Sequence, residues 1–441
     1  MIPVLQRATK VSQSKDVRWM RILAALLLLL ALLSAVVVTI HQRTSAVATG
    51  DDWPTYMHDI QRSSTSNDTT ISISNAGQLV KNWTFKTGGV IGSSSTVVAG
   101  TVYVGSWDGY EYALDAVTGT LKWKTYLGIT SGPTCNPPQA GITSTATVLN
   151  GVVYVGGGDS YWYALDATTG NVLWKVFTGD NTKGYYNWSS PLIYNNYAYI
   201  GIASFGDCPL IPGQLLQVDL NTHQVVNTLN LVPAGQVGGG IWGSPAIDTT
   251  TNTIYVATGT EANSSQMYAQ AILAIDASTL TIKSSWKLPE GQAVTDSDFG
   301  TTPIFFNDAS GNPLVVSINK NGYAYAFNRT NLAAGPVWTQ QIAIGGQCPT
   351  CGEGSVAPGT FGNGRLYLAG GQTTINGVGY LGSVRALDPS TGNILWQHGT
   401  PGTVLGALAY SNGLVVEAGG QLLEVLDASS GHDSIVTRLV T

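Results

Sequence analysis

The sequence predicts an all-β propeller built from four-stranded antiparallel blades, seven in number. Two observations lead to this prediction. A unit of short strands joined by tight turns recurs along most of the chain. The composition also suits a turn-rich β protein, because the 441 residues include 53 glycines, 12 tryptophans and 20 tyrosines but only 10% charged residues, against about 25% in an average soluble domain.

The clearest copy of the unit runs over residues 102–123, with the sequence VYVGSWDGYEYALDAVTGTLKW. Apolar residues alternate with small or polar ones in three short runs, which is the pattern of β-strands. The runs are separated by Asp108 and Gly109 and by a segment from Asp115 to Gly119, and these residue types favour tight turns. A further run, SSTVVAG, lies just upstream. Together the four strands make one blade.

The second turn of this unit recurs six more times. The seven turn residues are Asp115, Asp166, Asp219, Asp276, Asn328, Asp388 and Asp427. Their spacing of roughly 40–60 residues fits one blade plus its loops. A tryptophan follows in most copies, at Trp123, Trp174, Trp286, Trp338 and Trp396. We expect the aspartates to form turns and the tryptophans to pack one blade on the next.

Two segments compete to complete the last blade. Residues 79–86, LVKNWTFK, have the form of an outermost strand that carries Trp83, although no inner strands precede them. We expect this segment to pair with the last blade and close the ring. The competitor is the final segment, residues 434–440, and an eighth, partial blade stays open as an alternative.

The N-terminal part differs in composition from the repeats. Residues 1–21 are basic, and residues 22–40 are an uninterrupted apolar run close to the ~20 residues that span a bilayer. We expect a cytoplasmic tail, a transmembrane helix and a propeller outside the cytoplasm. The alternative is a signal cleaved near residues 46–48, which would make the protein secreted. Residues 41–76 then form a linker and lead-in, and residues 77–441 the propeller.

The repeat pattern resembles that of the quinoprotein dehydrogenase propellers, which use pyrroloquinoline quinone (PQQ). The resemblance rests on copies such as VVYVGGGDSYWYALDATTGNVLW and covers the chain from about Asp52 onward. The same repeat occurs in non-catalytic relatives such as the bacterial outer-membrane-assembly lipoprotein. The resemblance therefore implies the fold strongly and the activity weakly.

In the quinoprotein family the cofactor lies in a funnel on the propeller axis, lined by the residues that begin each inner strand. The matching segments here are VIGSS (90–94), AGITS (140–144), YNWSS (186–190), GIWGS (240–244), SDFGT (297–301), EGSVA (353–357) and TVLGA (403–407). Their aromatic and hydroxyl side chains suit a flat, anionic quinone, and would also suit a sugar or an aromatic ligand.

The resemblance also implies individual site residues. The segment 238–259, GGGIWGSPAIDTTTNTIYVATG, places Trp242 where the family has the tryptophan beneath its cofactor, and Lys320 matches the family's lysine at a turn. The predicted cofactor-binding residues are Trp242, Trp188, Ser244, Phe299 and Lys320. The structural alternatives are a core aromatic at the channel wall for Trp242 and an ordinary turn residue for Lys320.

The family's Ca²⁺ ligands and catalytic base are replaced in this chain. Thr260 stands where the family has an asparagine, Asp207 and Cys208 where it has a glutamate, and residues 265–267 where we place its base. No metal ligand is therefore predicted, and binding of Ca²⁺ with PQQ is not expected from these positions. An enzyme would need another acid as its base, and the candidates are Asp207, Glu261, Asp296 and Asp298.

The four cysteines suggest disulfides in an oxidising compartment. Cys348 and Cys351 form a CxxC on a loop, and Gly352 stands where haem attachment needs a histidine, so no haem is expected. We predict one disulfide between Cys348 and Cys351, and a second between Cys135 and Cys208, which lie on insertion loops at the funnel end of neighbouring blades.

Two functions remain open at this point. The first is a quinoprotein-like dehydrogenase that oxidises an alcohol or sugar with PQQ. The second is a non-catalytic propeller that binds a protein or glycan on its loop face as a scaffold or sensor. The net charge of −6 and the absence of a basic stripe in the sequence argue against nucleic acid as a partner.

Overall fold

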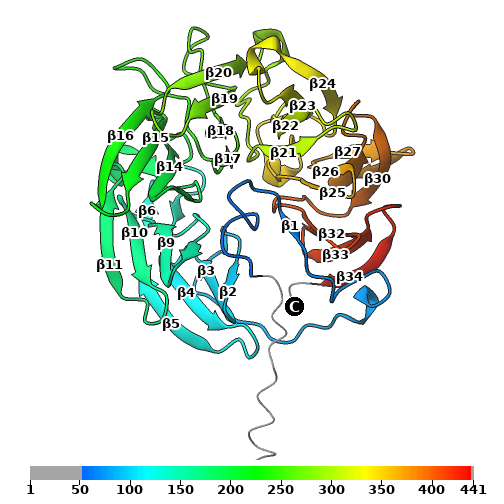
Figure 1. The fold of residues 1–441 in the computed structure, drawn as a ribbon, viewed down its shortest axis with the longest axis horizontal. Coiled ribbons are helices and arrows are strands. Elements are labelled where there is room, and N and C mark those ends of the chain that lie inside the picture. Colours follow the sequence, from blue (N-terminus) through cyan, green and yellow to red (C-terminus); the bar gives the residue numbers. More distant parts are fainter. Residues whose placement is uncertain (1–51, 439–441) are drawn as a thin grey trace, which may run out of the picture. The chain divides into compact units, whose positions relative to one another are not determined.

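The computed structural model describes residues 52–438, which form seven four-stranded antiparallel blades around a common axis (Figure 1). The strands of each blade follow one another from the axis outward. The first four blades are β2 (Thr96–Val98), β3 (Thr101–Gly105), β4 (Tyr110–Asp115) and β5 (Leu121–Tyr126); β8 (Thr147–Leu149), β9 (Val152–Gly156), β10 (Tyr161–Asp166) and β11 (Val172–Phe177); β13 (Leu192–Tyr194), β14 (Tyr197–Ser204), β15 (Gln214–Asp219) and β16 (Gln224–Asn230); β17 (Ala246–Asp248), β18 (Thr253–Ala257), β19 (Ala271–Asp276) and β20 (Ile282–Lys287). The last three are β21 (Ile304–Asn307), β22 (Pro313–Ile318), β23 (Tyr323–Asn328) and β24 (Pro336–Gln341); β25 (Thr360–Gly362), β26 (Arg365–Gly370), β29 (Gly382–Leu387) and β30 (Ile394–Thr400); β31 (Ala409–Ser411), β32 (Leu414–Gly419), β33 (Leu422–Asp427) and β34 (Asp433–Arg438).

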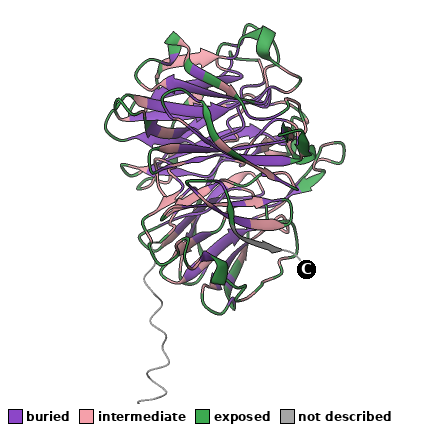
Figure 2. Ribbon diagram, turned by 90° about the vertical axis from the view of Figure 1, so that its right-hand side faces the viewer, coloured by how far each residue is buried: buried purple, intermediate pink, exposed green. Residues whose placement is uncertain are grey.

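Short elements decorate the blades. They are the hairpins β6 (Thr130–Ser131) with β7 (Gln139–Ala140) and β27 (Thr373–Ile375) with β28 (Val378–Tyr380), the strand β12 (Tyr185–Tyr186), and the 3-10 turns η1 (Ala76–Gln78), η2 (Asn181–Lys183), η3 (Glu290–Gln292), η4 (Leu332–Ala334) and η5 (Pro349–Cys351). Figure 2 shows buried residues along many of the strands and exposed residues in the connecting loops, and the outermost strands β5, β11 and β16 are also largely exposed. The core is therefore the set of contacts between neighbouring blades.

The predicted turn and packing roles of the repeat are confirmed. Asp115 Oδ1 accepts hydrogen bonds from the backbone N–H groups of Val117 and Thr118 at 3.1 and 2.9 Å. Trp123 donates its Nε1–H to Ala167 O in the next blade at 3.0 Å. Gly170 has a φ of +74°, and a Cβ there would lie 2.6 Å from the Trp123 ring. The repeat thus keeps a glycine where the indole of the preceding blade lies on the turn.

The lead-in, residues 53–66, lies in the middle of the ring (Figure 1). Trp53 pairs with Val97 of the first blade through backbone hydrogen bonds of 2.7 and 3.0 Å, and Val148 of the second blade donates to Pro54 O at 2.8 Å. At its other end, β1 (Thr65–Ser66) runs parallel to β31, the innermost strand of the seventh blade. The lead-in therefore joins the first blades to the last.

Arg62 is the centre of this segment and is fully buried. Its Nε donates to Pro245 O and its Nη2 to Pro191 O, both at 2.9 Å, and these carbonyls precede the inner strands of the fourth and third blades. Its Nη1 donates to Tyr56 O at 2.8 Å. Met57 packs into the core of the fifth blade, and Thr360 of the sixth donates to Ser63 O at 2.8 Å. Every blade thus contacts the lead-in.

The structure corrects the predicted ring closure. Residues 79–86 form no strand, and the outermost strand of the last blade is the competitor, β34, which pairs with β33. Residues 52–438 contain no eighth blade. Trp83 nevertheless takes the position of a blade tryptophan, because its Nε1 donates to Ala116 O at 3.0 Å and its ring lies against Gly119. The sequence pattern thus led to the indole contact but wrongly predicted a strand, because the indole of Trp83 reaches Gly119 from a segment that forms no strand.

The predicted transmembrane helix, residues 22–40, lies outside the described residues. No helix within residues 52–438 is long and apolar enough to cross a membrane.

Replacing Trp83 by alanine is expected to destabilise the propeller by about 2 kcal/mol, less than the ~3–5 kcal/mol of a fully buried tryptophan, because the side chain is half-buried. Urea unfolding of the two proteins measures the difference. Val80→Ala is the control, since Val80 is 86% exposed. A Trp83→Ala protein as stable as the Val80→Ala protein would contradict the contact.

Candidate functional site

The predicted funnel is a cavity of about 620 Å³ on the propeller axis. Its walls include residues from the starts of the inner strands, and Tyr56 of the lead-in also lines it. The lining residues used below are Tyr56, Trp107, Thr145, Trp188, Ser190, Trp242, Ser244, Thr302, Lys320 and Thr350. The volume falls in the range of about 300–1,000 Å³ that is usual for small-molecule sites.

Hydroxyl groups form a chain of hydrogen bonds around part of this cavity. Each accepts a backbone N–H from the preceding blade, at 2.9 to 3.0 Å. The pairs are Ser94 N to Thr145 Oγ1, Thr145 N to Ser190 Oγ, Ser190 N to Ser244 Oγ, and Ser244 N to Thr302 Oγ1. A hydroxyl that accepts one proton still has its own proton to donate. The wall can therefore donate hydrogen bonds to an anionic ligand.

The two predicted tryptophans border this cavity and also a second one of about 610 Å³. Trp188 donates its Nε1–H to Ser204 O at 2.9 Å, and Trp242 donates its own to Asp298 Oδ2 at 3.1 Å. Gly259 makes room for the second contact, because a Cβ there would lie 3.0 Å from Asp298 Oδ1 and 3.1 Å from Trp242 Nε1. Each indole is thus held by its nitrogen beside the space that a ligand would fill.

The second cavity contains the acids. Asp207 follows β14, Thr260 follows β18, Asp296 and Asp298 precede β21, and Lys320 lies in the turn between β22 and β23. These positions are all at one face of the propeller, because the second strand of a blade ends where the next blade's inner strand begins. The fold therefore brings together residues that are up to 113 positions apart (320 minus 207).

Lys320 joins two of the aspartates. Its Nζ lies 2.7 Å from Asp296 Oδ2 and 2.9 Å from Asp298 Oδ2, and 5.5 Å from the centre of the Trp242 ring. Burial raises the pKa of Asp298 to about 6, against the lowering effect of Lys320, and Asp296 raises it further. Burial lowers the pKa of Lys320, but the two aspartates outweigh it and the net shift is upward. At neutral pH the site thus holds an ammonium between carboxylates.

The contacts of Thr260 show that this cluster of carboxylates has more acceptor oxygens than protons to share among them. Its Oγ1 lies 2.8 Å from Asp207 Oδ2, 3.0 Å from Asp296 Oδ1 and 3.0 Å from Asp298 Oδ1. A hydroxyl has one proton to donate, so at most one of these contacts is a hydrogen bond from Thr260. The others need a proton on a carboxyl group or a cation. Burial also raises the pKa of Asp207, in agreement with this crowding.

Two other predicted site residues, Glu261 and Phe299, line neither cavity. Glu261 forms an ion pair with Lys287 at 2.5 Å and does not line either cavity. Phe299 is fully buried and packs on Tyr325, with ring centres 5.6 Å apart, and it lines neither cavity, so it does not face a ligand there as predicted. Successive side chains of an extended chain point to opposite sides. The side chain of the preceding residue, Asp298, therefore faces the cavity, and that of Phe299 faces the core.

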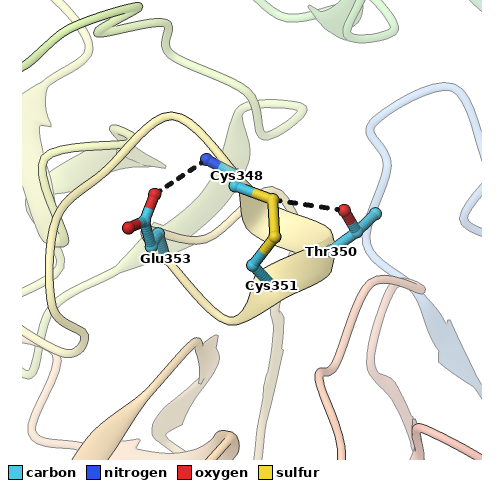
Figure 3. Close-up of a disulfide and its surroundings, with 4 residues drawn as sticks. All are labelled: Cys348, Thr350, Cys351 and Glu353. Atoms are coloured by element: carbon cyan, nitrogen blue, oxygen red, sulfur yellow. Dashed lines mark hydrogen bonds between the residues drawn. A yellow bond between two sulfur atoms is a disulfide. The ribbon is translucent and has the colours of Figure 1, made fainter. Parts of the chain in front are cut away.

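The Cys348–Cys351 disulfide is present and closes the short turn η5 (Figure 3). Figure 3 shows Glu353 accepting from the Cys348 backbone N–H, at 3.1 Å. Thr350, inside this turn, lines both cavities. The predicted Cys135–Cys208 disulfide is not formed, and both cysteines are free thiols. They are nevertheless adjacent, because Cys135 Sγ donates to Cys208 O at 2.9 Å. The prediction rested on the place of the two cysteines in insertion loops, and that place does not determine whether the two sulfur atoms bond.

Sequence reasoning missed several cavity residues. Tyr56 comes from the lead-in, which has no repeat pattern to place it. Trp107 lies in the first hairpin turn, and its Nε1 donates to Thr143 Oγ1 at 3.1 Å. Thr145 and Thr302 lie one residue beyond the segments that we matched. Aligning the repeats on their hydroxyl residues would have found the last two.

The family model described as outer membrane protein assembly factor BamB matches residues 67–331 and 320–434. The chain belongs to this PQQ-repeat family. It is 23% identical over 372 residues to polyvinylalcohol dehydrogenase of Sphingopyxis sp. (strain 113P3), covering 74% of this chain and 56% of the relative. It is 26% identical over 326 residues to quinohemoprotein alcohol dehydrogenase of Comamonas testosteroni, covering 64% and 45%. The chain thus spans about half the length of these relatives.

Two solved structures show the same fold. The europium-containing methanol dehydrogenase superposes with a TM-score of 0.73 at 18% identity, over 89% of this chain and 86% of that one. BamB from Moraxella catarrhalis superposes with a TM-score of 0.51 at 17% identity, over 76% and 85%. Both comparisons support a PQQ-repeat propeller.

Replacing Lys320 by methionine is expected to cost about 3–5 kcal/mol of stability at pH 8, because it leaves the buried Asp298 carboxylate without its cation, and less at pH 5. The sign follows from the raised pKa: folding favours the protonated carboxyl, so ionisation above about pH 6 opposes folding, and it does so more strongly without Lys320. Urea unfolding at both pH values measures the difference. The control is Lys283→Met, which removes a lysine bound to Thr253 Oγ1 and not to an acid. An equal loss at both pH values would contradict this reading of Asp298.

Proposed function

We propose that this protein is a quinoprotein-like dehydrogenase that binds PQQ in the axial cavity and oxidises an alcohol at the adjoining acid cluster. The observation that carries the proposal is the Trp242 indole. Its ring borders both cavities, and its nitrogen donates to Asp298, the buried acid with a raised pKa. A stacking surface and a candidate base thus meet at one side chain.

The axial cavity fits the chemistry of PQQ, a flat and anionic quinone. Trp242 and Trp188 supply aromatic surface, and the chain of Ser and Thr hydroxyls can donate to the edge of an anion. When bound, PQQ would supply the acceptor for the two electrons that leave an alcohol. The surrounding residues would orient it and exclude water.

Asp298 is the candidate for the base. A pKa of about 6 leaves it mostly ionised at neutral pH but more basic than an exposed aspartate, which suits removal of an alcohol proton. Lys320 and the Trp242 N–H hold its Oδ2. Its Oδ1 lies beside Thr260 and close to Asp207, at the edge of the second cavity.

The same oxygens fit a hard cation. Asp207, Asp296 and Asp298 carry three negative charges against the one positive charge of Lys320, and the Thr260 hydroxyl alone cannot satisfy them. A divalent ion such as Ca²⁺ prefers carboxylate and hydroxyl oxygens, and Asp207, Asp296 and Thr260 would hold it, which leaves Asp298 free to act as the base. Asp207 and Thr260 stand at the positions where the family has its glutamate and asparagine, so the changed residue types still supply oxygen ligands.

We further propose that the propeller works outside the cytoplasm, tethered by residues 22–40. The apolar length of that segment and its basic flank support this location. A purely non-catalytic scaffold is the weaker proposal, because the axial cavity is open and lined with hydroxyl, indole and ammonium groups.

The test of this function is a titration of the full-length protein with PQQ, with and without Ca²⁺, followed by tryptophan fluorescence. We expect saturable binding that weakens tenfold or more in Trp242→Leu, a loss of at least about 1.4 kcal/mol. Trp174→Leu is the control, since Trp174 stacks on His223 between blades and lines neither cavity. Absence of saturable PQQ binding in the wild-type protein would reject the proposal.

Asp298→Asn should still bind PQQ but should lower turnover by about 10²–10⁴-fold, the usual contribution of a general base. Oxidation of alcohols with an artificial electron acceptor measures this, and polyvinyl alcohol belongs in the screen because two relatives are named for it. Unchanged turnover in Asp298→Asn would reject Asp298 as the base, and it would not affect the proposal that PQQ binds in the axial cavity.

A further inference from the structure

A second group of charged side chains lies between the sixth and seventh blades, outside the site described above. His398 is on β30 of the sixth blade, Glu424 is on β33 of the seventh, and Asp433 begins β34. His398 Nε2 lies 3.3 Å from Glu424 Oε2 and 3.5 Å from Asp433 Oδ1. One ligand atom from each of the three residues lies within 4.8 Å of the other two.

The two separations from His398 Nε2 match those between ligands of a metal ion. Two ligands of a tetrahedral Zn²⁺ ion, each bound at about 2.0–2.1 Å, lie about 3.3–3.4 Å apart. The two distances from His398 Nε2 are close to this edge length. The side chains of His398 and Glu424 are 17% and 5% exposed, whereas that of Asp433 is 41% exposed. The group is thus enclosed on the blade side and accessible to an ion from solvent.

Glu417 is an independent sign that a cation belongs here. It is 2% exposed, and as an ionised carboxylate it has no hydrogen-bond donor among residues 52–438, because its one side-chain partner is another acid, Glu424. Glu417 on β32 stands directly opposite Glu424 on β33 in the antiparallel register, so the two side chains extend from the same face of the sheet. That face carries Glu424 toward His398. A buried, unpaired carboxylate is costly unless a positive group compensates it.

We propose that His398, Glu424 and Asp433, with Glu417 beside them, bind a divalent transition-metal ion that fastens the last blade to its neighbour. One imidazole with several carboxylates suits Zn²⁺ or Mn²⁺. The ion would connect β30 to three strands of the seventh blade, including β34, the last of the described strands along the chain. Its role is structural and does not depend on the function of the axial cavity.

The competing description has a proton in place of the metal. Without a cation, burial and then the neighbouring Glu424 raise the pKa of Glu417 to about 10. Glu417 would then be neutral at pH 7 and no metal would be needed. The two descriptions differ in whether the protein binds a metal ion through His398.

The test is calorimetric titration of the purified full-length protein, stripped with a chelator, with ZnCl₂ and separately with MnCl₂. We expect one His398-dependent site for at least one of the ions, weakened tenfold or more in His398→Ala and in Asp433→Asn. His432→Ala is the matched control, because His432 is exposed in the turn before β34, and should bind within about twofold of the wild type. The ion should raise the Tm of the wild type and not that of His398→Ala.

The axial acids could bind metal as well, and Asp207→Asn separates the two sites. Binding that persists in Asp207→Asn and is lost in His398→Ala supports the proposal. Binding that is lost in Asp207→Asn but kept in His398→Ala would place the ion at the axial cluster and overturn it, as would the absence of saturable binding by either ion. Circular dichroism of each variant shows that it is folded, and Asp433→Asn, an exposed change, serves if His398→Ala does not fold.

Discussion

The buried guanidinium of Arg62 is the interaction on which the closed ring most depends. Burying a charge is costly unless hydrogen bonds replace its water, and here the replacements are carbonyl oxygens at the starts of two blades and groups of the lead-in itself. Burial lowers the pKa of Arg62 to about 10, which still leaves it charged at neutral pH. Since its hydrogen-bond partners lie up to 183 residues from Arg62 in the sequence, they are brought together only when the blades are in place around the lead-in.

This dependence explains which parts of the fold could be read from the sequence. The blades were predictable because each is a local unit with its own turn aspartate and its own tryptophan contact, as at Asp115 and Trp123. Ring closure was not, because it is non-local and occurs once. The parallel pairing of β1 with β31 joins residues 345 positions apart (Tyr410 with Thr65), and two residues of strand leave no periodic signal. Trp83 was identified by analogy with the other indoles, yet its backbone needed no strand to reach Gly119.

The residues of the candidate site also divide into those that the repeat pattern predicts and those that lie in irregular loops. Trp242, Ser244 and Lys320 follow the repeat and its family resemblance, and their positions at the cavity were expected. Asp207 and Thr260 come from loops of irregular length, where residue-by-residue matching loses its register. Only the structure shows that Thr260 contacts both Asp207 and Asp298. Phe299 shows the opposite error, because a shift of one residue along an extended chain exchanges a cavity position for a core position.

The link between the two cavities follows from the bond between Trp242 and Asp298. The indole N–H points along the plane of its ring, so a ligand stacked on the ring cannot occupy the same place as the carboxylate that the nitrogen holds. A stacked ligand and the Asp298 oxygen are therefore kept at a fixed offset. Lys320 strengthens this arrangement, since its ammonium contacts Asp298 while lying 5.5 Å from the centre of the ring. Any substitution that frees the carboxylate from either donor would let it move relative to a ligand on the ring, so in the proposed enzyme the position of the base would depend on Trp242 and Lys320 as much as on Asp298 itself.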